Sequence, residues 1–364
     1  MKTAIITTTI NIPRLIEDYI INIRRYKHDC FFVIIGDKKT PAETKNYCNK
    51  IKKKYEAEIH YLDVNDQVKY LKKFPELNRH LVYNSIQRRN IALVFAYEHG
   101  AETIITIDDD NFFLAKDFVK LHAVGRTKDI EVLSSNTKWL NVCDYLKERD
   151  GRRFYHRGFP PEYRFLKEKI KIQKKKVKIV ANAGFWLEEP DIDALTRLYF
   201  PNQLITAIGY TKKNNFALEK NTWSPFNSQN TSLAREIIPA YFLSPYIGRY
   251  DDIWASYVIR KIADRLGHHV SYGQPLVRQK RNPHNFWKDL KKEDDGMRLT
   301  DLFTKTLRKI RLTEKTYRAC FGELTSKLKQ EFNKIDLTEP DKEFLFKYFE
   351  GMEVWVKTFK RLSG

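Results

Sequence analysis

A short apolar segment that ends in three aspartates constrains this chain more than any other feature. Thr103–Ile107 is β-branched throughout, which predicts a buried strand, and Asp108, Asp109 and Asp110 follow it directly. Three carboxylates at the end of a strand repel one another unless a cation lies among them. Open α/β sheets bind ligands at that edge, where a divalent metal with substrate phosphates is a usual occupant. The alternative is an acidic turn or a helix N-cap.

The spacing within the triplet separates two predicted metal ligands from one residue with another role. Alternate residues of an extended segment point the same way, so Asp108 and Asp110 are the predicted ligands of Mn²⁺ or Mg²⁺. Asp109 is then left to contact the nucleotide. Because the carboxylates repel one another, replacing Asp108 or Asp110 by alanine is expected to abolish activity and leave the fold intact.

The first third of the chain alternates strands and helices. Apolar, β-rich runs predict strands, and capping residues followed by amphipathic runs predict the helices between them. This order predicts an α/β fold with a mostly parallel, doubly wound sheet. The predicted strands span residues 3–10, 30–35, 58–62 and 103–107, and the predicted helices span about 13–26, 40–55 and 84–98.

The rest of the chain is less regular until its end. Residues 177–187 and 269–272 have strand character, and Asp251 begins a helix that Gly267 terminates. Apolar residues recur at helical spacing over 312–332 and 344–359, which predicts two long helices. The predicted organisation is a catalytic domain over residues 1–295 and a C-terminal helical extension over 296–364.

Composition bounds the class of protein. With 42% apolar residues the chain can bury a sizeable core, and no apolar run approaches the roughly 18 residues of a membrane span. The start of the sequence has no signal-peptide pattern, and the four cysteines are scattered without metal or disulfide spacing. These features predict a cytoplasmic protein with reduced thiols.

The formal net charge is +20, from 66 basic and 46 acidic residues. The lysines are spread along the chain and no nucleic-acid-binding motif accompanies them, so we expect a solvated basic surface and no nucleic-acid partner. A peripheral membrane association and a homo-oligomer are both compatible with such a surface.

Several charged residues outside the triplet fit a nucleotide-sugar site. Asp37 ends the second strand, where a carboxylate meets base or ribose, and Arg88 and Arg89 open the helix before the metal strand, where a guanidinium can reach a diphosphate. Arg157 and Arg164 lie seven residues apart in a Gly/Pro-broken segment and suggest an anion clamp. The alternatives are a turn aspartate, surface ion pairs and ordinary loop arginines.

Two further segments suggest catalysis and sugar binding. Asp251 and Asp252 head a helix beside aromatic residues, and they are candidate nucleophiles or bases; the alternative is N-cap charges favoured by the helix dipole. Trp254, together with Gly184 and Trp186, offers candidate sugar-stacking surfaces. A tryptophan of the core is the alternative.

Taken together, these segments resemble the reversibly glycosylated polypeptides of plants, a family that includes the UDP-arabinopyranose mutases. The resemblance covers nearly the whole chain and includes the Asp108–Asp110 segment, followed by Ala115-Lys116-Asp117. Arg157-Gly158-Phe159-Pro160 with Arg164 is similar to the arginine motif of that family. Further similar segments, in matching order, are Gly184-x-Trp186-Leu187, Pro190-Asp191-x-Asp193-Ala194-x-Thr196, Ile247–Ala255, Asn282-Pro283 and Leu290–Glu293.

The resemblance implies a fold and an activity. The implied fold is a glycosyltransferase-A-like nucleotide-sugar domain with a C-terminal helical extension. The implied activity is a metal-dependent, flavin-independent mutase that interconverts pyranose and furanose forms of a UDP-sugar such as UDP-arabinose. Reversible self-glycosylation at Arg157 is implied as well, with Arg164 also needed. A glycosyltransferase that uses an external acceptor is the second hypothesis, and a non-enzymatic sugar-nucleotide binder is the third.

Two departures from the family bear on these expectations. The family has Trp-His-Ser-Lys where this chain has Val277-Arg278-Gln279-Lys280, and an arginine is no metal ligand, so His284 is the predicted third ligand. The segment 205–230 also differs, near the expected sugar. For the Arg157 adduct, burial or the positive charge of Arg164 has to favour a neutral guanidine, because a guanidinium is a poor nucleophile.

Overall fold

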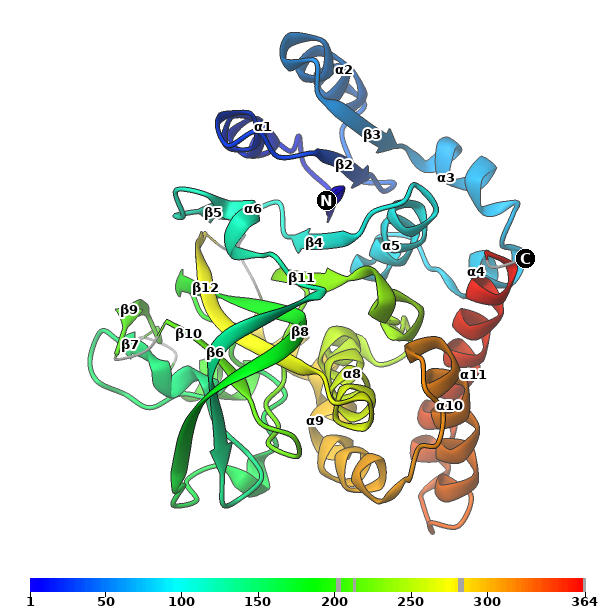
Figure 1. The fold of residues 1–364 in the computed structure, drawn as a ribbon. Helices are drawn as coiled ribbons and strands as arrows, with labels where there is room; N and C mark the ends of the chain where they lie inside the picture. The colour runs from blue at the N-terminus through cyan, green and yellow to red at the C-terminus, as the bar shows by residue number, and fades with distance from the viewer. Residues whose placement is uncertain (201–203, 212–213, 281–284, 363–364) are drawn as a thin grey trace.

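The computed structural model describes residues 1–200, 204–211, 214–280 and 285–362. Figure 1 shows one large, twisted sheet with helices around it and a helical C-terminal region on one side. The strands are β1 (Thr3–Thr8), β2 (Cys30–Ile35), β3 (Glu58–Leu62), β4 (Thr103–Ile107), β5 (Asn111–Phe113), β6 (Arg126–Ser135), β7 (Leu146–Glu148), β8 (Ile170–Glu188), β9 (Ala207–Tyr210), β10 (Asn215–Leu218), β11 (Asn230–Ala234) and β12 (His269–Gln279).

Helices connect these strands and form the C-terminal region. The α-helices are α1 (Ile16–Arg25), α2 (Glu43–Tyr55), α3 (Val64–Leu71), α4 (Pro75–His80), α5 (Arg89–Glu98), α6 (Phe118–Leu121), α7 (Ala194–Tyr199), α8 (Asp251–Leu266), α9 (Phe286–Lys309), α10 (Tyr317–Phe332) and α11 (Glu339–Arg361). The 3₁₀ helices are η1 (Ile86–Arg88), η2 (Val142–Tyr145), η3 (Pro161–Tyr163), η4 (Arg235–Ala240) and η5 (Gly248–Tyr250).

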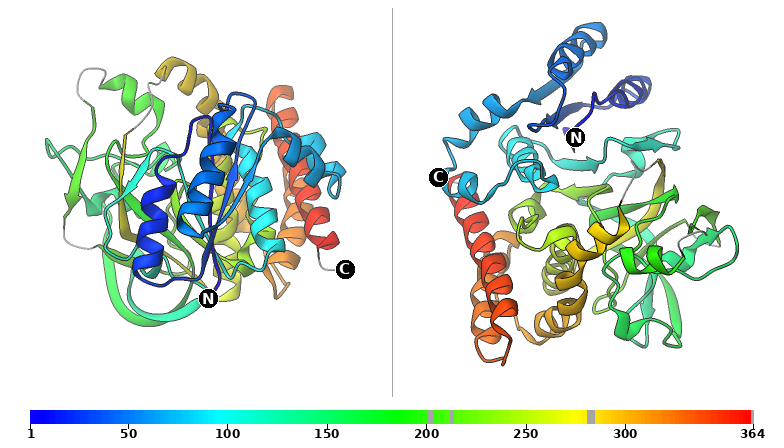
Figure 2. Two further views of the ribbon diagram at one scale, coloured as in Figure 1. Left: turned by 90° about the horizontal axis from the view of Figure 1, so that it is seen from above. Right: turned by 180° about the vertical axis from the view of Figure 1, so that it is seen from behind.

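The first four strands form the doubly wound part of the fold. They are parallel and stand in the order β3-β2-β1-β4. Strands β2 and β3 are therefore added on one side of β1, and β4 is added on its other side, so the strand order reverses between β1 and β4. Helices α1 and α2 lie on one side of these strands and α5 on the other (Figure 2, left). The strands β2, β3 and β4 have the predicted bounds. In such a sheet, ligands bind at the carboxyl ends of the strands beside the reversal.

The remaining strands make the sheet mixed, which corrects the expectation of a mostly parallel sheet. Antiparallel β11 pairs with β4 on one side and β8 on the other. Beyond it the order continues β8-β6-β10-β12-β5, and β8 also pairs with β12. The α/β class and the doubly wound arrangement of the first four strands are confirmed: a parallel half that ends at β4 is followed by an antiparallel strand and a mixed half.

The C-terminal region holds three long helices where the sequence predicted two. Helices α10 and α11 match the two predicted, whereas α9 was not expected. The predicted domain boundary at residue 295 falls inside α9, so this boundary coincides with no break between elements. Figure 1 shows α10 and α11 side by side, with α4 next to α11. Within the described ranges, no helix is long and apolar enough to cross a membrane.

Candidate active site

A cavity of about 580 Å³ opens at the carboxyl ends of β4 and β12. Its volume lies in the range of ligand pockets, about 300–1,000 Å³. The residues that line it come from segments far apart in the sequence, and polar side chains dominate. They include Asn84, Ser85, Gln87, Asp108, Asp110, Arg157, Asp191, Asn227, Ser228, Gln229, Gly248, Arg249, Asp251, Asp252, Gln279 and Lys292.

The aspartate triplet lies where the sequence placed it, at the end of β4. Asp108 and Asp110 both line the cavity. Asp109 does not line it, and its Oδ2 accepts hydrogen bonds from Thr9 Oγ1 at 2.5 Å and from Asn11 Nδ2 at 3.2 Å. Thr9 follows β1, so Asp109 ties the ends of β1 and β4 together at the point where the sheet reverses.

Asp108 is the counter-ion of a buried arginine. Its Oδ1 accepts from Arg89 Nη2 at 2.5 Å, and the Arg89 side chain is 1% exposed whereas that of Asp108 is 30% exposed. Burial raises the pKa of Asp108, and Asp109 and Asp252 raise it further, against the lowering effect of Arg89. Arg89, predicted to bind nucleotide, instead orients Asp108 from behind the cavity wall.

Arg157 lines the same cavity and is held by two carboxylates. Its Nε donates to Asp191 Oδ1 at 2.9 Å and its Nη2 to Asp191 Oδ2 at 3.0 Å, the planar fork that favours arginine. Nη2 also donates to Asp252 Oδ1 at 3.2 Å, and Nη1 donates to the carbonyl of Arg249. The next residue is Gly158, with φ +81°, where a Cβ would lie 2.2 Å from Ile253 Cγ2. The turn that aims Arg157 therefore requires glycine.

The electrostatics of Arg157 correct the expectation of a neutral guanidine. Burial by itself lowers the pKa of Arg157, but Asp191 and Asp252 more than offset it, and the pKa lies well above the ordinary value. The positive charge of Arg164 was expected to lower the pKa of Arg157. Arg164 is instead paired with another carboxylate, because its Nη2 donates to Asp193 Oδ2 at 2.7 Å. Arg164 is also absent from the residues that line the cavity. It anchors the segment, and Arg157 reaches the site.

Asp251 and Asp252 have different environments although they are neighbours at the start of α8. Asp252 Oδ2 accepts from the backbone N of Ser228 at 2.9 Å and from Ser228 Oγ at 3.1 Å, in addition to the Arg157 contact. Asp251 Oδ2 accepts from Gln87 Nε2 at 3.0 Å. Burial and the adjacent Asp252 raise the pKa of Asp251 to about 7. A carboxyl group with that pKa can both give and take a proton near neutrality.

The other residues predicted to bind nucleotide lie outside the cavity lining. Asp37 Oδ2 accepts from the backbone N of Ser85 at 3.2 Å, so Asp37 supports a residue that does line the cavity. Arg88 is 1% exposed, donates from Nε to Gln67 Oε1 at 2.7 Å and lies over the ring of Tyr83. Its buried position corrects the prediction that it contacts a diphosphate.

The sugar-stacking prediction is wrong for both tryptophans. Trp254 is fully buried and stacks on Phe303 of α9, with ring centroids 4.1 Å apart, while its Nε1 donates to Thr300. Trp186 is 1% exposed and lies in β8. Gly184 is also in β8, where a Cβ would lie 2.3 Å from Asn230 Nδ2. All three residues serve packing.

Sequence reasoning missed several residues of the cavity. Gln87, Asn227, Ser228 and Gln229 carried no signal, because uncharged polar residues are common throughout a chain. Lys292 belongs to the family-like segment Leu290–Glu293, in α9, but nothing in that segment marked it as a cavity residue. Asp191 did carry one, since its segment Pro190-Asp191-x-Asp193 repeats an acidic residue near the arginine segment. The structure shows what the repeat does, since Asp191 pairs with Arg157 and Asp193 with Arg164.

The residues of the predicted metal site fit a cation that also binds substrate. No three His, Cys, Asp or Glu side chains form a metal cluster in the part of the chain that the structure describes, and His284 lies outside that part. A Mg²⁺-type ion needs fewer protein ligands, because it usually takes one or two carboxylates together with phosphates and water. Asp108 and Asp110, facing one cavity, meet that requirement.

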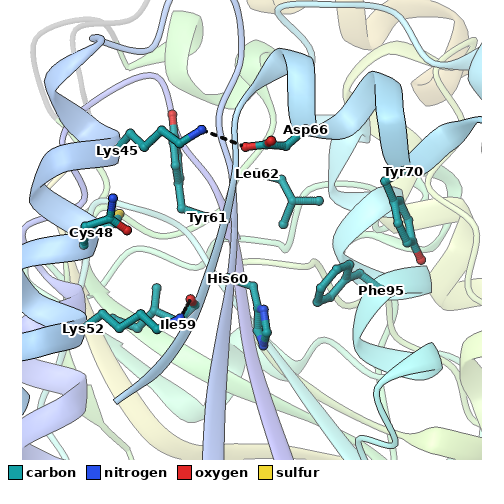
Figure 3. Close-up of a pocket in the computed structure, with 11 residues that line it drawn as sticks. Lys45, Cys48, Lys52, Ile59, His60, Tyr61, Leu62, Asp66, Tyr70 and Phe95 are labelled. Atoms are coloured by element: carbon teal, nitrogen blue, oxygen red, sulfur yellow. Dashed lines mark hydrogen bonds and ion pairs between the residues drawn. The ribbon is translucent and has the colours of Figure 1, made fainter. Parts of the chain in front are cut away.

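A second cavity, of about 380 Å³, lies at the open edge of β3 between α2 and α3 (Figure 3). Its charged side chains already have partners: Lys45 Nζ contacts Asp66 Oδ2 at 3.2 Å, and Lys52 reaches the carbonyl of Ile59. Lysines beside a free strand edge are a usual guard against unwanted strand pairing. The grouped carboxylates and the buried arginines belong to the larger cavity, which is the candidate active site.

Comparison with known proteins places the chain in a family. The family model described as reversibly glycosylated polypeptide matches residues 102–364. The chain is similar to UDP-arabinopyranose mutase 1 of Arabidopsis thaliana, with 29% identity over 269 residues, 71% of this chain and 69% of the relative. It is also similar to a protein named probable UDP-arabinopyranose mutase 4 of the same plant, with 28% identity over 276 residues, 71% of this chain and 68% of the relative.

Among solved structures, a mannosyltransferase from Pyrobaculum calidifontis in complex with GDP-Man and Mn²⁺ aligns over 99% of this chain and 84% of its own. The TM-score is 0.42 at 12% identity. The family match, in contrast, spans β4, the candidate active site from Asp108 onward and the C-terminal helices. The chain belongs to the reversibly glycosylated polypeptide family.

Proposed function

We propose that the protein is a metal-dependent, flavin-independent UDP-sugar mutase that interconverts pyranose and furanose forms of a sugar such as UDP-arabinose. The observation that carries the proposal is the meeting of Asp108 and Asp110 with the buried Arg157–Asp252 pair around one cavity of about 580 Å³. Membership of the family makes the protein an enzyme of the mutase or glycosyltransferase class, and the similar plant proteins are named UDP-arabinopyranose mutases.

The charge of the cavity supports the need for a cation. Five aspartates line it, against the three cationic side chains of Arg157, Arg249 and Lys292. Arg249 is already paired, its Nε with Glu293 Oε1 at 2.8 Å. A diphosphate is an anion and would be repelled by this lining. Mn²⁺ or Mg²⁺ held by Asp108 and Asp110 would supply the missing positive charge and polarise the leaving diphosphate.

Arg157 supplies fixed positive charge to the reaction. As the bond between C1 of the sugar and UDP weakens, negative charge grows on the diphosphate, and a charged donor already in position stabilises it. Asp191 keeps Arg157 oriented, and the high pKa keeps it charged. In the proposed reaction the ring oxygen and the 4-hydroxyl then exchange as the partner of C1, and UDP returns to the same carbon.

Asp251 is the proposed acid and base of that exchange. The 4-hydroxyl loses a proton when it bonds to C1, and the ring oxygen gains one when it leaves. With a pKa of about 7 and a place in the cavity lining, Asp251 is suited to take the first proton and return it. Asp252, committed to Arg157 and Ser228, is the poorer candidate.

Self-glycosylation at Arg157 remains part of the proposal, with a condition that the geometry adds. A guanidinium bonded to two carboxylates is no nucleophile. Arg157 must first leave Asp191 and lose a proton, so we expect labelling to be slow compared with the interconversion of ring forms. Intact-mass spectrometry after incubation with the donor measures the label, and excess UDP is expected to remove it.

One experiment separates this function from its alternative. The protein is incubated with UDP-arabinopyranose and Mn²⁺, with and without an external acceptor, and the nucleotide sugars are separated by chromatography. A UDP-arabinofuranose product supports the mutase. UDP that is released only when an acceptor is present identifies a glycosyltransferase that uses the same donor site. Unchanged donor under all conditions contradicts both.

A further inference from the structure

The two ends of the candidate active site are joined by one buried run of contacts. At one end Asp108 bonds Arg89 Nη2 at 2.5 Å, and at the other Asp191 bonds Arg157 Nε at 2.9 Å. Asp252 contacts Arg157 Nη2 at 3.2 Å. Carboxylates and guanidiniums alternate along this run, so each charge neighbours one of opposite sign.

Ser228 makes the connection between the two halves. Its Oγ accepts a hydrogen bond from Arg89 Nη1 at 2.8 Å and donates one to Asp252 Oδ2 at 3.1 Å. The hydroxyl has a single proton, so this pair of contacts fixes its direction. Ser228 is 4% exposed and lines the cavity. A hydroxyl between a buried cation and a buried anion is polarised by both, which strengthens each bond when the other is present.

We propose, resting on the function proposed above, that Ser228 is a positioning residue that couples Asp108 to Arg157, so that the two ends act on the diphosphate as a unit. When Asp108 moves from Arg89 toward the substrate, the hydrogen bond from Arg89 to Ser228 Oγ becomes stronger. Ser228 then binds Asp252 more tightly, and Asp252 releases Nη2 of Arg157 toward the diphosphate. Binding of the substrate by Asp108 thereby makes Arg157 available to the diphosphate.

The chain offers variants that separate this role from simple packing. Ser228→Ala removes only Oγ and leaves the backbone N–H to Asp252 and the carbonyl that accepts from Arg89, so the fold is expected to survive. Ser228→Thr keeps the hydroxyl. Ser224→Ala is the matched control: Ser224 is also buried and lies in the same loop, and its Oγ has no hydrogen-bond partner in the part of the chain that the structure describes.

The test is a double-mutant cycle repeated in four backgrounds. Asp108→Asn, Arg157→Lys and the double variant are compared with the parent protein, and the same four proteins are made with Ser228→Ala, with Ser228→Thr and with Ser224→Ala. Two quantities are measured: the Kd of UDP in saturating Mn²⁺ by calorimetry, and the metal-free free energy of unfolding by chemical denaturation. If Asp108→Asn does not fold, Asp108→Glu replaces it.

The expected result is non-additivity that depends on the Ser228 hydroxyl. In the parent and Ser224→Ala backgrounds the Kd values should deviate from additivity by at least about fivefold, as for coupled sites. With Ser228→Ala the Kd of the double variant should lie within about twofold of the additive value, and Ser228→Thr should restore the deviation from additivity. Parent-like coupling in Ser228→Ala, in binding or in unfolding, overturns the proposal. Absence of UDP binding by the parent protein contradicts the proposed function, and the unfolding cycle then still decides the coupling.

Discussion

Replacement of Asp108 should destabilise the protein, although the sequence alone predicted no effect on the fold. The guanidinium of Arg89 is fully buried, and Asp108 is its carboxylate partner at 2.5 Å. Removing one member of a buried ion pair costs about 3–5 kcal/mol, because the other charge stays buried without its counter-ion. Arg89 keeps its bonds to Ser228, and Asp108 is partly exposed, so we expect Asp108→Ala to cost about 3 kcal/mol, at the low end of that range.

The size of the protein converts this cost into a shift of the melting temperature. An unfolding entropy of about 2.1 cal/mol/K per residue gives roughly 0.76 kcal/mol/K for 364 residues, so 3 kcal/mol lowers Tm by about 4 °C. Differential scanning calorimetry of the metal-free protein measures the shift. Asp110→Ala is the comparison variant, with an expected decrease of Tm smaller than that of Asp108→Ala, because Asp110 is not the counter-ion of Arg89.

A second variant tests the cause directly. Asp108→Ala combined with Arg89→Met removes both charges and should recover part of the lost stability, since an apolar side chain then replaces the unpaired guanidinium. If Asp108→Ala has the same Tm as the parent protein, the charge of Arg89 is balanced by Ser228 and Asp252 alone. The ion pair would then have no structural role.

Three further outcomes follow from the site and its surroundings. Because burial raises the folded-state pKa of Asp251 to about 7, above its ordinary 3.8, stability should fall as pH rises between about 4 and 7, and Asp251→Asn should remove that loss in chemical denaturation. The same variant should lower kcat at least about a hundredfold, and the residual activity should show no inflection near pH 7. Arg157→Lys should lower kcat/KM about a hundredfold through loss of the planar fork, whereas Arg164→Lys, outside the cavity lining, should cost clearly less in the same steady-state assay. Trp254→Ala should cost about 3–5 kcal/mol in chemical denaturation through the cavity it leaves, and UDP affinity of the folded fraction should stay near the parent value.

The sequence predicted the parallel half of the fold well because its signals are local. Strand β2 is an uninterrupted apolar run and every residue of β4 is β-branched, which leaves little choice of structure or bounds. Helix α9 was missed because its buried face includes Glu293, Gly296 and Thr300, which do not register as apolar at helical spacing. Antiparallel β11 followed from no local pattern, since strand direction depends on how distant segments meet.

Among the site residues, too, those with a local signal were predicted and those that depend on contacts between distant segments were not. Asp108 and Asp110 were predictable because a strand end determines where its next residues point. Trp254 was assigned to the sugar although it stands two residues from Asp252, and residues two apart on a helix face nearly opposite sides. The pairing of Arg157 with Asp191 was beyond sequence reasoning, because it joins two irregular loops.

The proposed function requires that this cavity interconverts sugar ring forms with the help of a divalent cation. The most direct measurement follows UDP-arabinopyranose by real-time NMR of the sugar C1 proton, in Mn²⁺ and in excess EDTA, with the parent protein and with Asp110→Ala. We expect a growing furanose signal for the parent protein in Mn²⁺, and none in EDTA or with Asp110→Ala. Equal rates in EDTA, or no furanose at any metal concentration, would contradict it.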